Sequence, residues 1–247
     1  MEKFDYLHYP SASQRMATFA RRGMVATSQP LAAEVGVQMI KQGGNAIDAA
    51  IASAACLTVV EPTSNGIGSD AFALVWTKGK LHGLHASGKS PANISIDALK
   101  AQGYEKMPTY GLIPVTVPGA PGAWAELSRK FGKLPLSEVL QPAIDYAENG
   151  FAVTPIIAKT WQSAHNAYSK LEGEEFKPWF ETFSPNGKPP KVGEIWRSPD
   201  HAKTLRSIAE SNAESFYRGE LATKIAEYSR KYNGFITEDD MAAFRSE

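Results

Sequence analysis

The clearest structural signal in the chain is the stretch Gly43-Gly44-Asn45-Ala46-Ile47-Asp48-Ala49-Ala50. The glycine pair predicts the end of one helix, and Asn45 predicts the N-cap of the next, which we expect to continue to about residue 58. Six of the ten residues from 46 to 55 are alanine, and small side chains on all sides let neighbouring helices approach closely. We therefore expect a central helix, with Asp48 stabilising its positive N-terminal end.

On either side of this helix, the sequence predicts short strands. Residues 1–23 are predicted to be an irregular N-terminal lead-in, and the apolar residues 24–27 predict a strand. Pro30 suits the first position of a helix that ends at the glycine pair. After the central helix, residues 63–70 form a loop of small residues. Residues 71–76 are apolar enough for a buried strand, and Lys78-Gly79 predicts the turn to a second strand over residues 80–85.

The second half of the chain is predicted to be rich in helices. Residues 172–198 are rich in Pro, Gly and charge and predict an excursion on the surface. Pro142 is expected to kink or split the helix that contains it. The sequence predicts an α/β fold in which helices cover a sheet. The helices are expected over residues 123–131, 136–147, 155–171, 199–210, 219–232 and 237–245.

Composition excludes several classes of protein. The 247 residues contain 26 basic and 26 acidic side chains, and this balance argues against a dedicated nucleic-acid or polybasic membrane protein. No apolar run is long enough for a membrane helix, and the N-terminus lacks the pattern of a secretory signal, so we expect a soluble cytoplasmic protein. The single cysteine, Cys56, excludes an internal disulfide and a cysteine-based zinc site.

Few residues suggest chemistry by their pattern alone. Gly66-Ile67-Gly68 and Gly88-Lys89-Ser90 partly match phosphate-binding loops, but neither lies between a predicted strand and a helix, which favours ordinary turn glycines. His82 and His85 are an odd number of residues apart, so a strand places them on opposite faces and disfavours a metal pair. Cys56 is expected to be a buried, inert thiol.

Considered alone, the residues give no catalytic constellation, since no serine has an obvious base partner in the sequence. Two loops, residues 63–70 and 86–91, bracket the predicted hairpin. Loops at strand ends are where α/β proteins usually bind ligands.

The opening motif resembles the Gly-Gly-Asn-Ala-x-Asp-Ala-Ala signature of the gamma-glutamyltranspeptidases. The resemblance covers about residues 23–247 and implies an N-terminal nucleophile hydrolase with an αββα four-layer sandwich. Such enzymes cut their own precursor before a threonine, which then accepts a γ-glutamyl or related acyl group and passes it to water or an amine. Further similarity lies in Val117-Pro118-Gly119, Pro121-Gly122, Leu134-Pro135-Leu136, Gln141-Pro142-Ala143, Gly150-Phe151, Leu205 to Ala209, Phe216-Tyr217, Gly219, Ile236-Thr237 and Asp240.

One departure from the family concerns the nucleophile. The chain contains no adjacent pair of threonines, where the family has a Thr-Thr-His-type motif. The resemblance therefore implies that residues 1–247 are an incomplete large-subunit segment, with no catalytic residue of its own and no metal or organic cofactor. The implied partners are a small γ-glutamyl or acyl-amide substrate and the remaining C-terminal part or small subunit of the precursor. The alternative is a non-catalytic binding or scaffold domain that has lost self-processing.

A second departure concerns substrate binding. The family's γ-glutamyl enzymes carry an Arg-Glu pair shortly before a proline, and alignment on Pro91 places Ser87-Gly88 there. A neutral pair cannot make the bidentate, charge-assisted contact that an arginine makes with a carboxylate. In this respect the chain resembles the cytoplasmic, acylase-type branch of the family. Lys89 either substitutes for that cation or points to solvent. Asp70 either lines the pocket or caps its loop. The candidate substrate-binding residues are thus Ser87, Gly88, Lys89 and Asp70.

Overall fold

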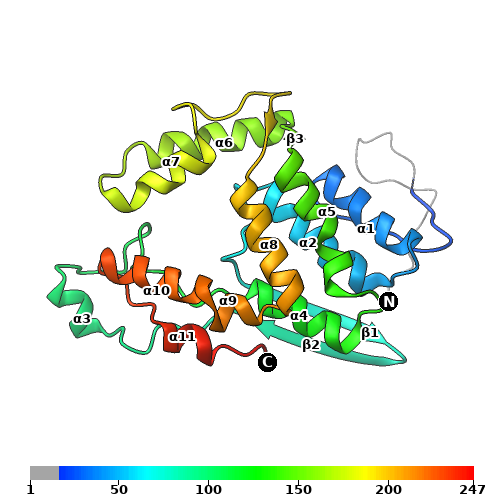
Figure 1. Ribbon diagram of the computed structural model, residues 1–247, viewed down its shortest axis with the longest axis horizontal. Coiled ribbons are helices and arrows are strands. Elements are labelled where there is room, and N and C mark those ends of the chain that lie inside the picture. The colour runs from blue at the N-terminus through cyan, green and yellow to red at the C-terminus, as the bar shows by residue number, and fades with distance from the viewer. Residues whose placement is uncertain (1–16) are drawn as a thin grey trace.

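Four helices packed side by side form the main layer of the protein, whose computed structural model describes residues 17–247. Helix α2 (Ala46–Val60) packs between α1 (Pro30–Lys41) and α5 (Leu136–Asn149), and α8 (Pro199–Ser211) packs against α5 (Figure 1). The expected central position of the alanine-rich helix is confirmed. Its first turn has the expected cap, because the Asn45 side chain accepts hydrogen bonds from the backbone N–H groups of Ile47 and Asp48.

A β-hairpin lies against this helical layer. Strands β1 (Ala71–Thr77) and β2 (Lys80–Ala86) pair antiparallel, and Lys78 and Gly79 both have the positive φ of a tight hairpin turn. Helix α4 (Ala120–Phe131) contacts both strands. Val75, Leu84 and Ala86 are buried on this side, so the predicted hairpin is confirmed, with one face joined to the core.

The opposite face of the hairpin is apolar and exposed. We call it the apolar hairpin face. The prediction of a fully buried strand over residues 71–76 is wrong for this face, because the helical layer covers the hairpin from one side only. Its side chains are Phe72, Leu74, Trp76 and Leu81, which are 66%, 78%, 71% and 61% exposed.

Two short strands and an aromatic cluster support a second lobe of helices. Strand β3 (Phe151–Ala152) pairs with β4 (Ile195–Trp196), and between them lie α6 (Pro155–Tyr168), a 3₁₀ turn (Glu174–Phe176) and α7 (Lys177–Phe183). Residues 172–198, predicted as a surface excursion, thus contain a helix and a strand. Trp196 is buried, with its ring 5.0 Å from that of Trp161.

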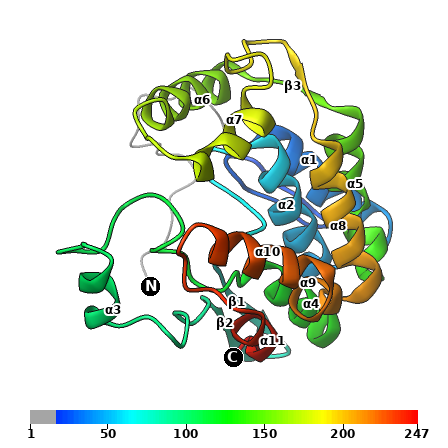
Figure 2. The same cartoon turned by 60° about the vertical axis from the view of Figure 1, so that its left-hand side comes forward.

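The remaining helices return the chain to the hairpin. Helices α9 (Glu214–Arg218), α10 (Glu220–Lys231) and α11 (Glu238–Ala243) contact one another, whereas α3 (Ile96–Ala101) stands apart (Figure 2). The C-terminus lies beside β2 (Figures 1 and 2). There His85 and Glu247 exchange both backbone hydrogen bonds, with N···O distances of 2.7 and 2.8 Å.

Two local predictions need correction. Residues 24–27 form no strand, because no ladder partner lies beside them within residues 17–247. Pro142 does not split its helix, and α5 runs unbroken past it. The predicted lead-in, residues 1–23, lies partly outside the described residues.

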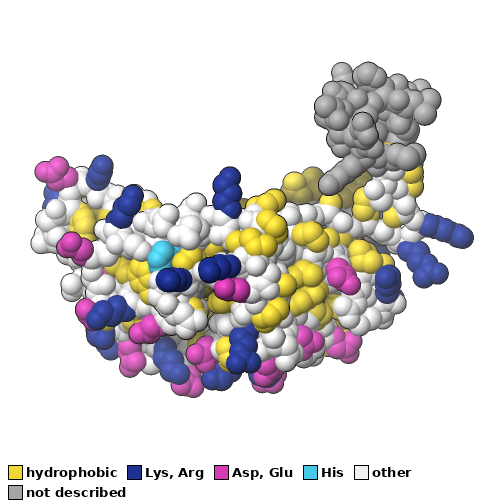
Figure 3. All heavy atoms as spheres, turned by 90° about the horizontal axis from the view of Figure 1, so that it is seen from above, with side chains coloured by type: hydrophobic (Ala, Val, Ile, Leu, Met, Phe, Trp, Pro, Cys, Tyr) yellow, Lys and Arg dark blue, Asp and Glu magenta, His cyan; other side chains and the backbone are white. Residues whose placement is uncertain are grey.

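Charge on the surface is mixed. On the face shown in Figure 3, acidic and basic side chains are interspersed around groups of hydrophobic side chains. Within residues 17–247, none of the helices combines the length and hydropathy that crossing a bilayer requires.

Candidate functional site

The two loops that bracket the hairpin meet at its open end. Asp70 immediately precedes β1, and Ser87 and Gly88 immediately follow β2. The backbone N–H of Gly88 lies 3.4 Å from Oδ1 of Asp70 and donates to it. The structure therefore brings together three of the four residues predicted to bind substrate, and gives Asp70 a contact that holds its neighbouring loop.

Main-chain contacts fix the position of this loop. The carbonyl of Ser69 accepts from the N–H groups of Gly119 and Ala120 at 3.0 and 2.8 Å, and Val117 N–H donates to the Lys89 carbonyl at 3.1 Å. A Cβ atom at Gly88 would lie 1.4 Å from the carbonyl oxygen of Val117. Glycine is therefore required at residue 88, where two backbone segments cross in contact.

A buried tyrosine anchors the crossing segment. The Tyr217 hydroxyl donates to the carbonyl of Pro118 at 2.7 Å and accepts from Gly122 N–H at 3.0 Å. Its ring stacks on Phe244 with centroids 4.7 Å apart. Burial raises the pKa of Tyr217, so the phenol keeps the proton that it donates. The segment over residues 118–122, which leads into the first turn of α4, is thus tied to α9.

The site contains a side-chain pair that the sequence analysis missed. The Oγ atom of Ser87 lies 2.7 Å from Nε2 of His85, and the His85 ring is 5.2 Å from that of Phe72. Their spacing of two residues along an extended segment was the available signal, since it places both side chains on one face. The prediction that His82 and His85 face opposite sides is confirmed, because His82 instead packs against Phe131.

Lys89 differs from the other predicted site residues. Its side chain is 87% exposed, and its Nζ atom lies 3.9 Å from a carboxylate oxygen of Glu247. An exposed ion pair at that distance contributes little. The structure therefore places this cation at the rim of the site.

The motif that begins at Gly43-Gly44-Asn45 has a structural role rather than a place in the candidate site. The buried carboxylate of Asp48 accepts from the backbone N–H groups of Asn45 at 2.7 Å, Lys133 at 3.0 Å and Leu134 at 3.4 Å. The Asn45 amide donates to the carbonyl of Phe131 at 2.7 Å. The motif therefore ties the start of α2 to the end of α4 through the buried Asp48 carboxylate.

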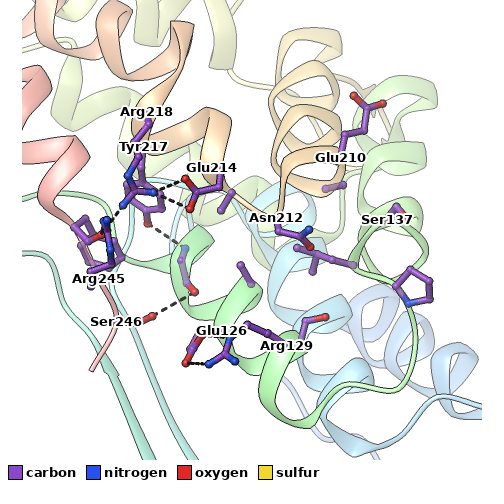
Figure 4. A pocket seen from close by; sticks show the side chains of 18 residues that line it. Glu126, Arg129, Ser137, Glu210, Asn212, Glu214, Tyr217, Arg218, Arg245 and Ser246 are labelled. Carbon is purple, nitrogen blue, oxygen red and sulfur yellow. Dashed lines mark hydrogen bonds and ion pairs between the residues drawn. The ribbon is translucent and has the colours of Figure 1, made fainter.

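A second concave surface lies between α4, α8, α9 and residues 244–246 (Figure 4). Arg129 binds Glu126 at 2.8 Å, and Arg218 binds Glu214 at 2.7 Å. The hydrogen bond from Arg129 holds the pKa of Glu126 at about 2. Both arginines are thus neutralised by a carboxylate one helical turn away, and we do not place the substrate site here.

The other reactive groups sit apart from the loops. Cys56 is buried in α2, and burial raises the pKa of its thiol to about 12, in keeping with the predicted inert thiol. Among residues 17–247, no three His, Cys, Asp or Glu side chains are grouped so that they could hold a metal ion.

A helical layer on one face of a β-hairpin, with the candidate loops at the strand ends, is an α/β arrangement. Solved structures place this fold among the N-terminal nucleophile hydrolases. Cephalosporin acylase from Bacillus halodurans superimposes with a TM-score of 0.93 at 59% identity, over 99% of this chain and 46% of that one. Gamma-glutamyltranspeptidase from Helicobacter pylori gives a TM-score of 0.85 at 31% identity, over 94% of this chain and 66% of that one.

The chain belongs to the gamma-glutamyltranspeptidase family, whose sequence model matches residues 32–247. A curated relative, the glutathione hydrolase-like YwrD proenzyme of Bacillus subtilis (strain 168), is 35% identical over 229 residues. That match covers 91% of this chain and 42% of the relative. The chain therefore spans about two fifths of the length of a curated relative.

Proposed function

We propose that this chain is part of a longer acyltransferase or amide hydrolase of the gamma-glutamyltranspeptidase type. The proposal rests on the similarity to a cephalosporin acylase along nearly the whole chain. The nucleophile is a threonine outside residues 1–247, exposed when the precursor cuts itself, and the freed α-amine serves as base. Residues 17–247 supply the framework and one wall of the acyl-binding site.

Self-processing and turnover test this proposal together. The full-length precursor should separate into two chains on standing, and replacing its nucleophilic threonine by alanine should keep it whole. The processed protein should release aniline from acyl anilides, and the unprocessed variant should not. A wild-type precursor that stays a single chain yet is fully active contradicts the mechanism. A precursor that neither splits nor turns over favours a non-catalytic scaffold instead.

The substrate class follows from the loop residues. We propose that Asp70, Ser87, Gly88 and Lys89 line the acyl-binding loop, with Asp70 and Gly88 shaping it. An arginine bonded to a carboxylate contributes roughly 1.5–3 kcal/mol, and each ~1.4 kcal/mol is tenfold in kcat/KM. With Ser87 at this place, γ-glutamyl donors should be weaker substrates than in the arginine-containing enzymes by roughly ten- to a hundredfold.

The partner of the apolar hairpin face is the remaining part of the precursor. Four large apolar side chains there are more than half exposed, and such a contiguous patch marks an interaction surface. We propose that the rest of the precursor also pairs with the outer edge of β2, where His85 already exchanges both backbone hydrogen bonds with Glu247.

Mutation of the apolar hairpin face tests this partner. Leu74→Asp should weaken association of the two co-expressed parts at least tenfold, because it buries a charge in the interface. Ile156→Asp is the matched control, since Ile156 is equally exposed on α6. Equal effects of the two substitutions would exclude the hairpin as the docking surface.

The cytoplasmic location expected from the sequence stays a prediction.

A further inference from the structure

The sequence contains four Asn–Gly steps, at residues 65–66, 149–150, 186–187 and 233–234. An asparagine side chain can react with the backbone nitrogen of the next residue, and glycine offers the least hindered nitrogen because it has no Cβ atom. The asparagine must rotate until its Cγ atom reaches that nitrogen, and the glycine N–H must leave its own hydrogen bond. The structure therefore decides which of the four steps can react.

The step at Asn65 is held at both reacting groups. The Asn65 amide donates to Oε2 of Glu61 at 3.3 Å. The backbone N–H of Gly66 donates to Oγ of Ser69 at 3.0 Å. Reaction at this step requires both contacts to open together.

The second and fourth steps are held by packing as well. Asn149 is the last residue of α5, and the N–H of Gly150 donates to the Tyr146 carbonyl at 2.9 Å. The N–H of Gly234 donates to the Ser229 carbonyl at 2.7 Å. A Cβ atom at Gly150 or Gly234 would lie 2.6 Å from its nearest neighbour. Neither glycine therefore has room to turn toward the asparagine that precedes it.

The step at Asn186 lacks these restraints. It lies in the exposed loop between α7 and β4, and no group within residues 17–247 forms a hydrogen bond with the Asn186 amide. A Cβ atom at Gly187 would meet nothing within 4 Å in the described part of the chain. The Gly187 N–H donates to the Ser184 carbonyl at 2.7 Å, and a single turn bond at the surface opens readily.

We propose that Asn186 is a site of spontaneous deamidation. The Gly187 nitrogen releases its proton to base and bonds to Cγ of Asn186, while the Cγ–Nδ2 bond breaks and Nδ2 takes up a proton and leaves as ammonia. Water opens the remaining succinimide ring at either carbonyl, which gives aspartate or isoaspartate. One water is consumed and one ammonia is released, so the conversion needs no further reactant. The product adds a negative charge to a loop that contains Lys188 and Lys191.

Peptide mapping of the aged full-length protein tests the proposal, with the other three steps as internal controls. In folded protein at pH 8, Asn186 should convert at least about tenfold faster than each of the other three asparagines. In denaturant the four rates should agree within about threefold, because the restraints of the fold are gone. Asn186→Gln has a longer side chain that would have to close a six-membered ring. This variant should therefore lose the acidic form that accumulates with age on isoelectric focusing.

Three results would overturn the proposal. In the first, Asn186 converts no faster than another Asn–Gly step of the folded protein. In the second, the four rates keep the same ratios in folded and denatured protein, so that the neighbours in sequence set their order. In the third, aged Asn186→Gln accumulates the acidic form as fast as wild type, which would place the modification elsewhere.

Discussion

At the scale of single residues, a buried carboxylate organises the helical core. Asp48 accepts hydrogen bonds from its own helix start at Asn45 and from the loop between α4 and α5 at Lys133 and Leu134. Gly44 and Gly132 make room for it, because a Cβ atom at either would lie within 3.1 Å of a carboxylate oxygen. The sequence predicted the cap from Asn45 but could not predict the loop contacts, since residues 133 and 134 are distant in sequence.

Substitution of Asp48 should therefore be costly. Asp48→Ala leaves three backbone N–H groups without their acceptor and should lower the free energy of unfolding by about 3 kcal/mol or more. Asp48→Asn keeps one oxygen and should lose about half as much. Chemical denaturation measures both, with Asp145→Asn as the control, because Asp145 is an exposed carboxylate on α5. A loss for Asp48→Ala no greater than that of the control would contradict this role.

Cys56 should be unreactive in the folded protein. Burial raises its pKa to about 12, so the thiolate that reacts with electrophiles is scarce at neutral pH. Iodoacetamide at pH 8 should leave the native chain unlabelled over hours and label it fully in denaturant. Mass spectrometry gives the labelled fraction. Rapid labelling under native conditions would show that α2 opens frequently.

At the scale of elements, the candidate site forms where the loop after β2 crosses the segment over residues 117–119. The sequence predicted the hairpin and the bracketing loops, because turn residues and apolar runs are local signals. It missed the short helices α3 and α9, which are only six and five residues long. It also missed the Ser87–His85 pair, which needs the end of β2 to stay extended past residue 86. Backbone contact with residues 117–119 supplies that constraint, and no local pattern encodes it.

Two glycines, Gly83 within β2 and Gly88 in the loop that follows it, distinguish this local constraint from a general effect of glycine. Gly88→Ala would place a methyl group 1.4 Å from the Val117 carbonyl oxygen and should cost roughly 3 kcal/mol or displace the loop. Gly83→Ala meets nothing within 4 Å and should be neutral or slightly stabilising. Thermal unfolding compares the two. Similar melting temperatures for the two variants would mean that the loop can move away from residues 117–119 at little cost in stability.

At the scale of the whole molecule, one histidine links the helical layer across its width. Nε2 of His201 on α8 lies 3.1 Å from Oγ1 of Thr58 on α2. That hydroxyl donates to the Ala55 carbonyl, so it accepts the imidazole N–H. Burial lowers the pKa of His201 from 6.5 to about 4, and its position in the first turn of α8 also disfavours a positive charge.

Stability should therefore depend on pH through His201. The unfolded chain binds a proton on this residue below pH 6.5, whereas the folded chain resists protonation down to about pH 4. The free energy of unfolding should fall by up to roughly 3 kcal/mol as the pH decreases across that window. His201→Gln, which keeps an N–H donor for Thr58, should flatten the dependence. A variant curve parallel to that of wild type would assign the effect to other groups.

The main-chain contacts between the two loops that bracket the hairpin and residues 117–120 also bear on how this protein could change its substrate. These hydrogen bonds run between main-chain atoms of Ser69, Lys89, Val117, Gly119 and Ala120, so they place no demand on the side chains at residues 87 and 89. Mutations can therefore change the groups that we propose to select the substrate without changing the backbone frame that holds them. A single codon change at residue 87 should then alter acyl preference with little effect on folding, which makes this position a suitable starting point for directed evolution.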